Sequence, residues 1–520
     1  MMRAFFLLLI SVSLAVADTR VEHFVTPAGA GTASGADWAN AWSLANINTA
    51  GNWGAGETKV TAGETVYLSG GSGSALYGDT LDIQLGGVTF KPGAAHATLS
   101  SGHDGQVQIF AAGVAIECNT LTNVVIDGRW GGQWTNRFTI PSVSDYKIWA
   151  RSTNSVGVHW KGSWNQFYSI AAVACGDTED TDHGFLCNAN EGAEPVGVII
   201  DGCFSAMNYG DAFNIGRSNT NNATNIILRS SFIYSNRVDG IQIPGGLTYT
   251  NNLIDGTGNQ DAAHGDGIQG AGGNMTIAGN TFRNWPQSIF IESGGSDAYM
   301  GNIRIFNNEF YRQSSYTTYM LAISLKAKFT SAGQSVFMEN LLIANNTVQN
   351  TYDRHGVRIQ YAPTPDAGTF TITNSRIVNN IFIDIVSSSR PVAVDDAVLL
   401  TDASLTIQTN NVFGNETFTW DNTDYASIAL LVAAHPTFTG NTNASPVFVA
   451  TNSYNLRLDA ADVYCRSAAV TVTGVEMDIV GNVRSSTAPS IGAWEYVETV
   501  PGRVSATLNR VELRGGVFIR

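Results

Sequence analysis

A short phrase recurs along this 520-residue chain and constrains its fold more than any other feature. From residue 201 onward, two small or polar residues, one variable residue and a hydrophobic residue recur in this order at steps of 22 to 38 residues. The asparagine forms NNLI, NNEF, NNTV, NNIF and NNVF begin at Asn251, Asn307, Asn345, Asn379 and Asn410. Recurrence at this period indicates one supersecondary unit stacked on itself.

Alternating apolar segments flank each copy of the phrase, such as NIRIF before it and SIFIES after it. Two or three short strands per unit, turned by asparagine and glycine, predict the coils of a parallel β-helix. Asparagine tolerates the left-handed backbone conformation of such turns, and stacked copies can hydrogen-bond along the axis. A β-sandwich would need hairpin signals roughly every 8–12 residues, and these do not dominate. The chain is therefore predicted to be all-β, a single-stranded solenoid.

The N-terminus has the parts of a secretory signal peptide. Arg3 precedes a short apolar run that ends in Ala15-Val16-Ala17, which predicts cleavage after Ala17 and a secreted, extracellular or cell-surface protein. No later stretch approaches about 18 apolar residues, so no transmembrane segment is expected. The formal net charge of −15 argues against nucleic acid, but local basic patches can still bind an anionic glycan.

The cysteine count is odd. Cys175, Cys187 and Cys203 lie close enough in sequence for one local disulfide in an exported protein, with Cys118 and Cys465 further away. No CxxC pair or histidine spacing indicates zinc. The pairing among the five is left open.

Strand alternation predicts one outward column of side chains. In GIQI, Ile241 and Ile243 point into the core, so Gln242 points out. The same alternation on successive rungs places outward Asn214, Gln242, Gln269, Phe290, Glu292, Ser324, Lys326, Arg358 and Gln360. Substrate binding is assigned to Asn214, Gln242, Gln269, Gln360 and Tyr361.

Acidic residues stand at the turn before several of these strands. Asp211, Asp239 and Asp266 precede successive rungs, with His264 beside the last. Rungs about 4.8 Å apart would let three or four of them share one sugar-sized groove. Aligned carboxylates raise one pKa and suit either glycoside hydrolysis or a calcium site built from Asp211, Asp239 and Asp266.

A structural interpretation competes with this one at each position. Asp-Gly is common turn chemistry, and stacked Gln242 and Gln269 could be only an amide ladder. His183, His355 and His435 are each more typical of surface residues than of catalysts.

Basic residues gather on the next rungs of a chain otherwise poor in them. They are Arg304, Arg312, Lys326, Lys328, Arg354 and Arg358. Elimination across a uronate needs its carboxylate neutralised, a base for the C5 proton and an acid for the leaving oxygen, which lysine, arginine, histidine, tyrosine or calcium can supply.

Three segments resemble known families. The opening His23–Leu44 and Ala62–Gly71 resembles that of secreted right-handed β-helix proteins of the pectate-lyase superfamily. The motifs Asp478–Arg484 and Ile491–Glu495 resemble the closing segment of bacterial secreted β-helix proteins, and Lys326–Ile359 resembles the alginate-lyase and chondroitinase-B family. These resemblances imply a right-handed helix with an N-terminal cap, a C-terminal closing segment and carbohydrate chemistry.

The resulting division of the chain is 1–17 signal peptide, 18–110 N-terminal cap and first coils, 111–450 β-helix coils, 451–498 closing segment and 499–520 tail or cap.

Three functions are compatible with these sequence patterns. The first is a polysaccharide lyase acting on an acidic glycan, the second a glycoside hydrolase using stacked carboxylates, and the third a non-catalytic adhesion or structural rod. The expected catalytic residues are Asp239, His264, Asp266, Glu292, Lys326, Arg354, His355 and Arg358, with Ca²⁺ as the one expected cofactor.

Overall fold

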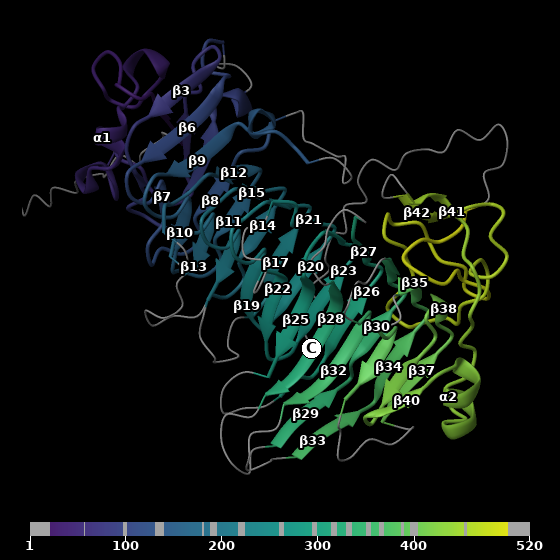
Figure 1. Ribbon diagram of the computed structural model, residues 1–520. Coiled ribbons are helices and arrows are strands. Elements are labelled where there is room, and N and C mark those ends of the chain that lie inside the picture. The colour runs from purple at the N-terminus through teal and green to yellow at the C-terminus, as the bar shows by residue number, and fades with distance from the viewer. Residues whose placement is uncertain are drawn as a thin grey trace, which may run out of the picture.

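The computed structural model describes residues 21–56, 58–96, 101–130, 140–178, 181–187, 195–216, 224–258, 265–293, 299–313, 320–328, 335–349, 355–362, 369–385, 389–395, 404–451 and 455–497. In these ranges the chain winds into a right-handed parallel β-helix, which confirms the predicted fold class (Figure 1). Each coil adds one strand to each of three long sheets, and neighbouring coils pair in parallel.

The three sheets are numbered here by the order in which the chain enters them. Sheet 1 has 13 strands, from β1 (Glu22–Val25) to β37 (Leu405–Gln408), and sheet 2 has 12, from β3 (Ser74–Tyr77) to β38 (Asn411–Gly414). Sheet 3 runs through β4 (Leu81–Asp82), β7 (Ile116–Glu117), β10 (Val158–Trp160), β13 (Phe185–Cys187), β16 (Phe213–Ile215), β19 (Ile241–Pro244), β22 (Asp266–Ala271), β25 (Gln287–Glu292), β28 (Leu321–Lys328), β32 (Val357–Ala362), β36 (Val392–Val394), β39 (Phe418–Trp420) and β40 (Thr423–Tyr425).

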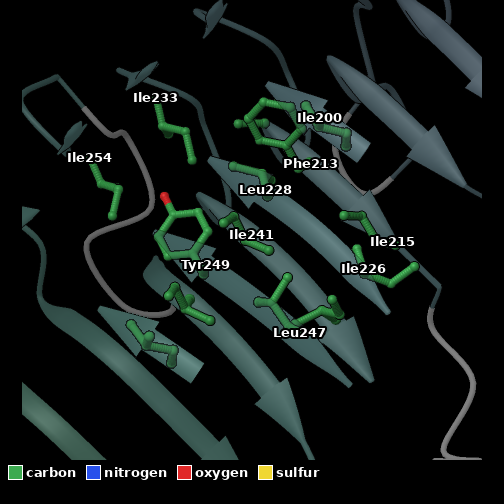
Figure 2. Close-up of a cluster of buried hydrophobic side chains, with 14 of the residues drawn as sticks. Ile200, Phe213, Ile215, Ile226, Leu228, Ile233, Ile241, Leu247, Tyr249 and Ile254 are labelled. Carbon is green, nitrogen blue, oxygen red and sulfur yellow. The ribbon is translucent and has the colours of Figure 1, made fainter. Parts of the chain in front are cut away.

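One continuous hydrophobic core fills the inside of the coils. Inward residues such as Phe213, Leu228, Ile241, Tyr249 and Ile254 stack coil upon coil, as Figure 2 shows. Aromatic rings also repeat along the axis, because equivalent positions on neighbouring rungs face each other. This is the burial that a single coil cannot achieve alone.

The two residues of the recurring Asn-Asn pair have different structural roles. In the pairs that begin at Asn251, Asn307, Asn345 and Asn379, the first residue adopts the left-handed conformation of the turn, as at Asn307 with φ +55°. The second is buried, and its amide donates to the side-chain oxygen of the next copy, as from Asn308 to Asn346 at 3.0 Å. The last pair is shifted by one residue, because Thr409 adopts the left-handed conformation and Asn410 takes the buried position. We call this buried stack the asparagine ladder; it comprises Asn252, Asn280, Asn308, Asn346, Asn380, Asn410 and Asn441.

Short helices lie at both ends of the described coils (Figure 1). Near the N-terminus, α1 (Leu44–Ile47) contributes Leu44 and Ile47 to the core. At the other end, α2 (Ile428–Ala434) does the same through Leu431. Covered ends leave few strand edges on which another chain could pair.

The segment from β41 (Phe448–Ala450) and β42 (Asn455–Leu458) to residue 497 folds back along the outside of the coils (Figure 1). Buried Arg484 donates to the side chain of Asn307 at 2.7 Å and to the carbonyl of Gly492 at 2.8 Å. Trp494 donates from its indole to Glu309 at 2.5 Å. The closing segment therefore docks on rungs far earlier in the sequence.

The possible disulfide is not formed. All five cysteines are buried free thiols. Cys118, Cys175, Cys187 and Cys203 pack in the core of the coils, whereas Cys465 packs between the closing segment and the outside of the coils. In the described part of the chain, no helix is long and apolar enough to cross a membrane. The predicted signal peptide and the tail 499–520 lie outside the described residues.

Candidate functional site

A polar pocket of about 300 Å³ opens on the outer face of sheet 3, between β13 and β25. It is lined by His183, Asp211, Asn214, Val238, Asp239, Gln242, Asp266, Gln269, Gln287 and Phe290. These side chains come from five successive rungs, whereas the sequence predicted a groove shared by three or four. The pocket is therefore a product of coil stacking.

Three aspartates form one wall and occupy equivalent positions on consecutive rungs. The backbone N–H of Asp239 donates to Oδ1 of Asp211 at 3.0 Å, and that of Asp266 donates to Oδ1 of Asp239 at 2.8 Å. We call this stack the carboxylate ladder. The Oδ1 atoms of Asp211 and Asp239 are each turned along the helix axis toward the next rung, and neighbouring rungs lie about 4.8 Å apart.

An amide row runs beside the carboxylate ladder. Strand register places Asn214, Gln242 and Gln269 opposite one another. The amide of Asn214 donates to Gln242 at 2.9 Å, and that of Gln242 donates to Gln269 at 2.6 Å. The row is thus an amide ladder and also part of the pocket wall, so both earlier interpretations of these glutamines apply.

His183 lies at the start of the same wall, although its sequence context suggested an ordinary surface residue. It is 4% exposed, and its Nδ1 accepts the backbone N–H of Asp211 at 3.0 Å. The same nitrogen is 3.4 Å from Oδ2 of Asp211, which also accepts from Asn214 at 2.8 Å. Sequence reasoning missed it because it weighed the histidine singly. The His-Gly-Phe phrase, 28 residues before Asp-Ala-Phe, was the available signal.

The three aspartates of the carboxylate ladder are almost fully buried. Asp211, Asp239 and Asp266 are 3%, 4% and 3% exposed. Among the described residues, no three histidine, cysteine, aspartate or glutamate side chains are grouped so as to hold a metal ion. Calcium binding by Asp211, Asp239 and Asp266 stays a prediction.

Of the predicted basic residues, Lys326, Lys328 and Arg358 lie on the following rungs of sheet 3. Arg304 lies instead on sheet 1, and Arg312 follows β27 (Glu309–Tyr311) of sheet 2. Register places Glu292, Lys326 and Gln360 opposite one another, and Phe290 opposite Ser324 and Arg358. The strand register therefore aligns these residues as the sequence predicted. Ser324 faces outward between the inward Ile323 and Leu325, but neighbouring side chains cover it fully, and Gln360 Nε2 lies 3.4 Å from its hydroxyl.

Several of these basic groups are already paired. Lys328 contacts Glu292 at 3.1 Å, and Arg358 contacts Asp395 at 2.7 Å. His355 Nδ1 accepts the backbone N–H of Arg390 at 3.0 Å. Lys326 is different, since its Nζ lies 5.9 Å from the ring centroid of Phe290, a pocket residue.

Some predicted residues cannot be placed. His264 and Arg354 lie outside the described residues, as does the side chain of Tyr361. Val238 and Gln287 line the pocket and were not predicted. Gln287 pairs in register with Asp266, so it continues the aspartate column with an amide.

Comparison with known proteins finds no matching family model and no matching curated protein. Among solved structures, pectate lyase Pel9A matches at 14% identity and a TM-score of 0.32, covering 92% of this chain and 97% of its own. A complex of XylC with xylose matches at 9% identity and a TM-score of 0.44, covering 92% and 98%. A family 28 exopolygalacturonase from Yersinia enterocolitica matches at 12% identity and a TM-score of 0.33, covering 74% and 73%. These superpositions are loose, and the coil architecture stands on the strand pairing of the chain itself.

Proposed function

We propose that this protein is a polysaccharide-active enzyme whose pocket on sheet 3 hydrolyses glycosidic bonds with Asp239 and Asp266. The observation that carries the proposal is the carboxylate ladder, which brings buried acids from neighbouring rungs into one pocket beside hydrogen-bonding amides. A purely structural ladder has no need of charge, because asparagine forms the same kind of stack elsewhere in this chain.

The spacing of the acids favours a two-step reaction. Carboxyl groups about 5–5.5 Å apart suit retaining hydrolysis, and neighbouring rungs lie about 4.8 Å apart. One carboxylic acid protonates the leaving oxygen while the other, as a carboxylate, attacks the anomeric carbon. The first group then takes a proton from water, which displaces the sugar from the enzyme with net retention.

The remaining pocket residues suit a sugar ligand. Gln242 and Gln269 offer amide groups to hydroxyls, and the ring of Phe290 offers an apolar surface to one face of the sugar. A pocket of about 300 Å³ lies at the small end of ligand sites, which suits a short stretch of a longer chain.

The test is a panel of acidic and neutral polysaccharides with a reducing-end assay. Asp239→Asn and Asp266→Asn should each lower the rate by about 10²–10⁴-fold, because the general acid or nucleophile is lost. Asp239→Asn keeps the Oδ1 that accepts the backbone N–H of Asp266, and thermal unfolding of both variants checks that the fold is retained. Asp395→Asn is the matched control on the same sheet outside the pocket, and its activity should equal that of the wild type.

The first-formed anomer of the product, followed by NMR, tests the pairing. Retention is expected for neighbouring rungs. Inversion, or full activity in both pocket variants, would exclude the Asp239–Asp266 pair as the catalytic machinery.

Lys326 favours a second candidate, a lyase acting on a uronate. Its ammonium group is beside Phe290 at the edge of the pocket and could serve as the base in β-elimination. An unsaturated product absorbing in the near ultraviolet, lost in Lys326→Ala and kept in Asp239→Asn, would establish this reaction in place of hydrolysis.

Export is proposed together with the activity. The segment before Asp18 has the parts of a signal peptide. N-terminal sequencing of the protein from culture medium should begin at Asp18, and an intact Met1 in the cell extract alone would contradict export.

A further inference from the structure

A second groove lies on the outer face of sheet 1, and nothing in the proposed reaction uses it. Its volume is about 280 Å³. Its floor and ends come from β26 (Ile303–Phe306), β30 (Leu342–Ala344) and β34 (Ser375–Val378), three neighbouring strands of this sheet. Thr473 of the closing segment forms part of its rim.

Two arginines stand at the ends of the groove floor. Strand register places Arg304 opposite Leu342, and Leu342 opposite Arg376. The two guanidinium-bearing residues are therefore two rungs apart, about 9.6 Å along the axis, with an apolar side chain between them.

Arg376 lacks the acidic partner that several other surface arginines of this acidic protein have. Arg229 pairs with Asp201 at 3.0 Å, and Arg390 pairs with Asp424 at 2.6 Å. Among the described residues, the Arg376 guanidinium makes no ion pair or hydrogen bond, and it lines the groove. A guanidinium fork left in this state can bind a planar carboxylate through two hydrogen bonds.

The closing segment holds the rim in place. Val472 and Val475 pack against Ala344 and Val378, and Leu342 packs against the same cluster. Arg304 Nη2 donates to the carbonyls of Thr473 and Gly474 at 3.3 and 3.1 Å. The groove is therefore a formed feature, with its walls fixed before any ligand arrives.

Exposed asparagines line the other side. The amide of Asn340 donates to Asn302 at 3.0 Å, and that of Asn374 donates to Asn340 at 2.6 Å. Each amide has a second N–H, and each carbonyl has a second lone pair. Such a row presents repeated donors and acceptors at the rung spacing, which suits the hydroxyls of a repeating polymer.

We infer that this groove is a non-catalytic binding site for a carboxylate-bearing polysaccharide that lies along the helix axis. A uronate carboxylate binds Arg376, an apolar sugar face rests on Leu342, and hydroxyls bond to Asn340 and Asn374. The site lies on a different sheet from the catalytic pocket, so it would hold the polymer without taking part in bond cleavage. This inference does not rest on the proposed hydrolysis.

Binding can be measured without turnover by affinity electrophoresis of the full-length protein in native gels. The probes are polygalacturonate, alginate and polygalacturonate whose carboxyl groups have been reduced to alcohols. The background variant is Asp266→Asn, so that the probe is not consumed. Arg376→Ala should weaken binding of the acidic polymer by about tenfold, because a hydrogen-bonded charge pair is lost, and Arg376→Lys should restore part of it.

Arg229→Ala is the matched control, since it removes a paired arginine from the same sheet, and its binding should be unchanged. Unaltered thermal unfolding of Arg376→Ala establishes that the fold is intact. Equal binding by Arg376→Ala and its parent would overturn the inference, as would equal binding of the carboxyl-reduced polymer. Neither result depends on whether the pocket on sheet 3 is active.

Discussion

The asparagine ladder and the carboxylate ladder are both products of the same coil repeat, but they differ in charge and location. In the first, Asn308 is fully buried and donates to Asn346, so neutral amides satisfy one another inside the turn. In the second, Asp239 accepts the backbone N–H of Asp266 and also lines a pocket. Both stacks satisfy backbone groups along the axis, but only the second brings like charges together.

This difference shows that coil stacking requires hydrogen bonds along the axis but does not require charged side chains. Neutral amides provide the hydrogen bonds of a solenoid without electrostatic repulsion. Carboxylates on neighbouring rungs repel by about 1 kcal/mol even in water, and more where water is scarce. The carboxylate ladder is therefore better explained by chemistry than by stability, and exchanging the two residue types tests this directly.

Asn308→Asp should have the largest effect on stability. The amide of Asn308 donates to the carbonyl of Ile277 at 2.9 Å and to Asn346 at 3.0 Å, and a carboxylate would place oxygen against both oxygens. A loss of about 3–5 kcal/mol in the free energy of unfolding is expected at pH 7. Burial raises the pKa of such a carboxyl, so the folded state binds more protons and the loss should shrink as pH falls toward the unfolded pKa.

Thermal unfolding at pH 7 and at about pH 4 measures this. Asn374→Asp makes the same change in the exposed asparagine row and should cost less than about 1 kcal/mol. Similar losses at the two sites would contradict the distinction between buried and exposed stacks.

Tyr249→Phe should stabilise the protein. Tyr249 is fully buried in the core shown in Figure 2, and in the described part of the chain its hydroxyl has no hydrogen-bond partner. Removing an unsatisfied hydroxyl should add about 1–2 kcal/mol to the free energy of unfolding. Tyr77→Phe is the matched control with the opposite sign, because its hydroxyl donates to the carbonyls of Val25 and Ser69 at 3.0 Å each. Destabilisation by both changes, measured by chemical denaturation, would refute this account of Tyr249.

The fold could be predicted because one repeat period and a two-residue strand alternation fix which side chains align. The alignment of Asp239 with Asp266, and of Gln242 with Gln269, follows from a phrase repeated 27 residues apart. His183 was missed although the same register extends to Asp211 and one rung further, to His183 itself. The error came from judging a histidine by its residue type rather than by its position in the repeat.

Contacts between distant segments could not be predicted in the same way. The ion pair of Arg358 was not predicted, because its partner Asp395 comes from the next rung across a loop of irregular length. Arg484 and Asn307 are 177 residues apart. No periodicity connects them, because the closing segment lies outside the repeat and docks on it by shape and hydrogen bonding.

The buried thiols should have a moderate effect that depends on pH. Burial raises the pKa of Cys203 from 9.0 to about 12. Between these values the unfolded state has lost the proton and the folded state has kept it, so stability falls as pH rises above 9. Cys203→Ala should therefore reduce the loss of stability between pH 8 and pH 10 by about 1 kcal/mol. A thiol reagent at neutral pH should label all five cysteines only after unfolding, and labelling of Cys203 in the native protein would contradict its burial.

Asp239→Asn should have the smallest effect on stability, and it tests the difference between the asparagine ladder and the carboxylate ladder most directly. The new amide keeps the Oδ1 that accepts the Asp266 N–H, and it removes a charge flanked by two like charges on neighbouring rungs. The free energy of unfolding should stay the same or rise by up to about 1 kcal/mol, since repulsion is relieved. Chemical denaturation of this variant beside the wild type measures the change, and the reducing-end assay measures its activity in the same preparation. A loss above about 2 kcal/mol would mean that the carboxylate is held by a cation or proton that the fold needs, and the ladder would then be structural. Unchanged stability together with lost hydrolysis would show that the two stacks have different roles. The amide at Asn308 would then be required for folding, whereas an amide at residue 239 would leave the fold intact and abolish the activity.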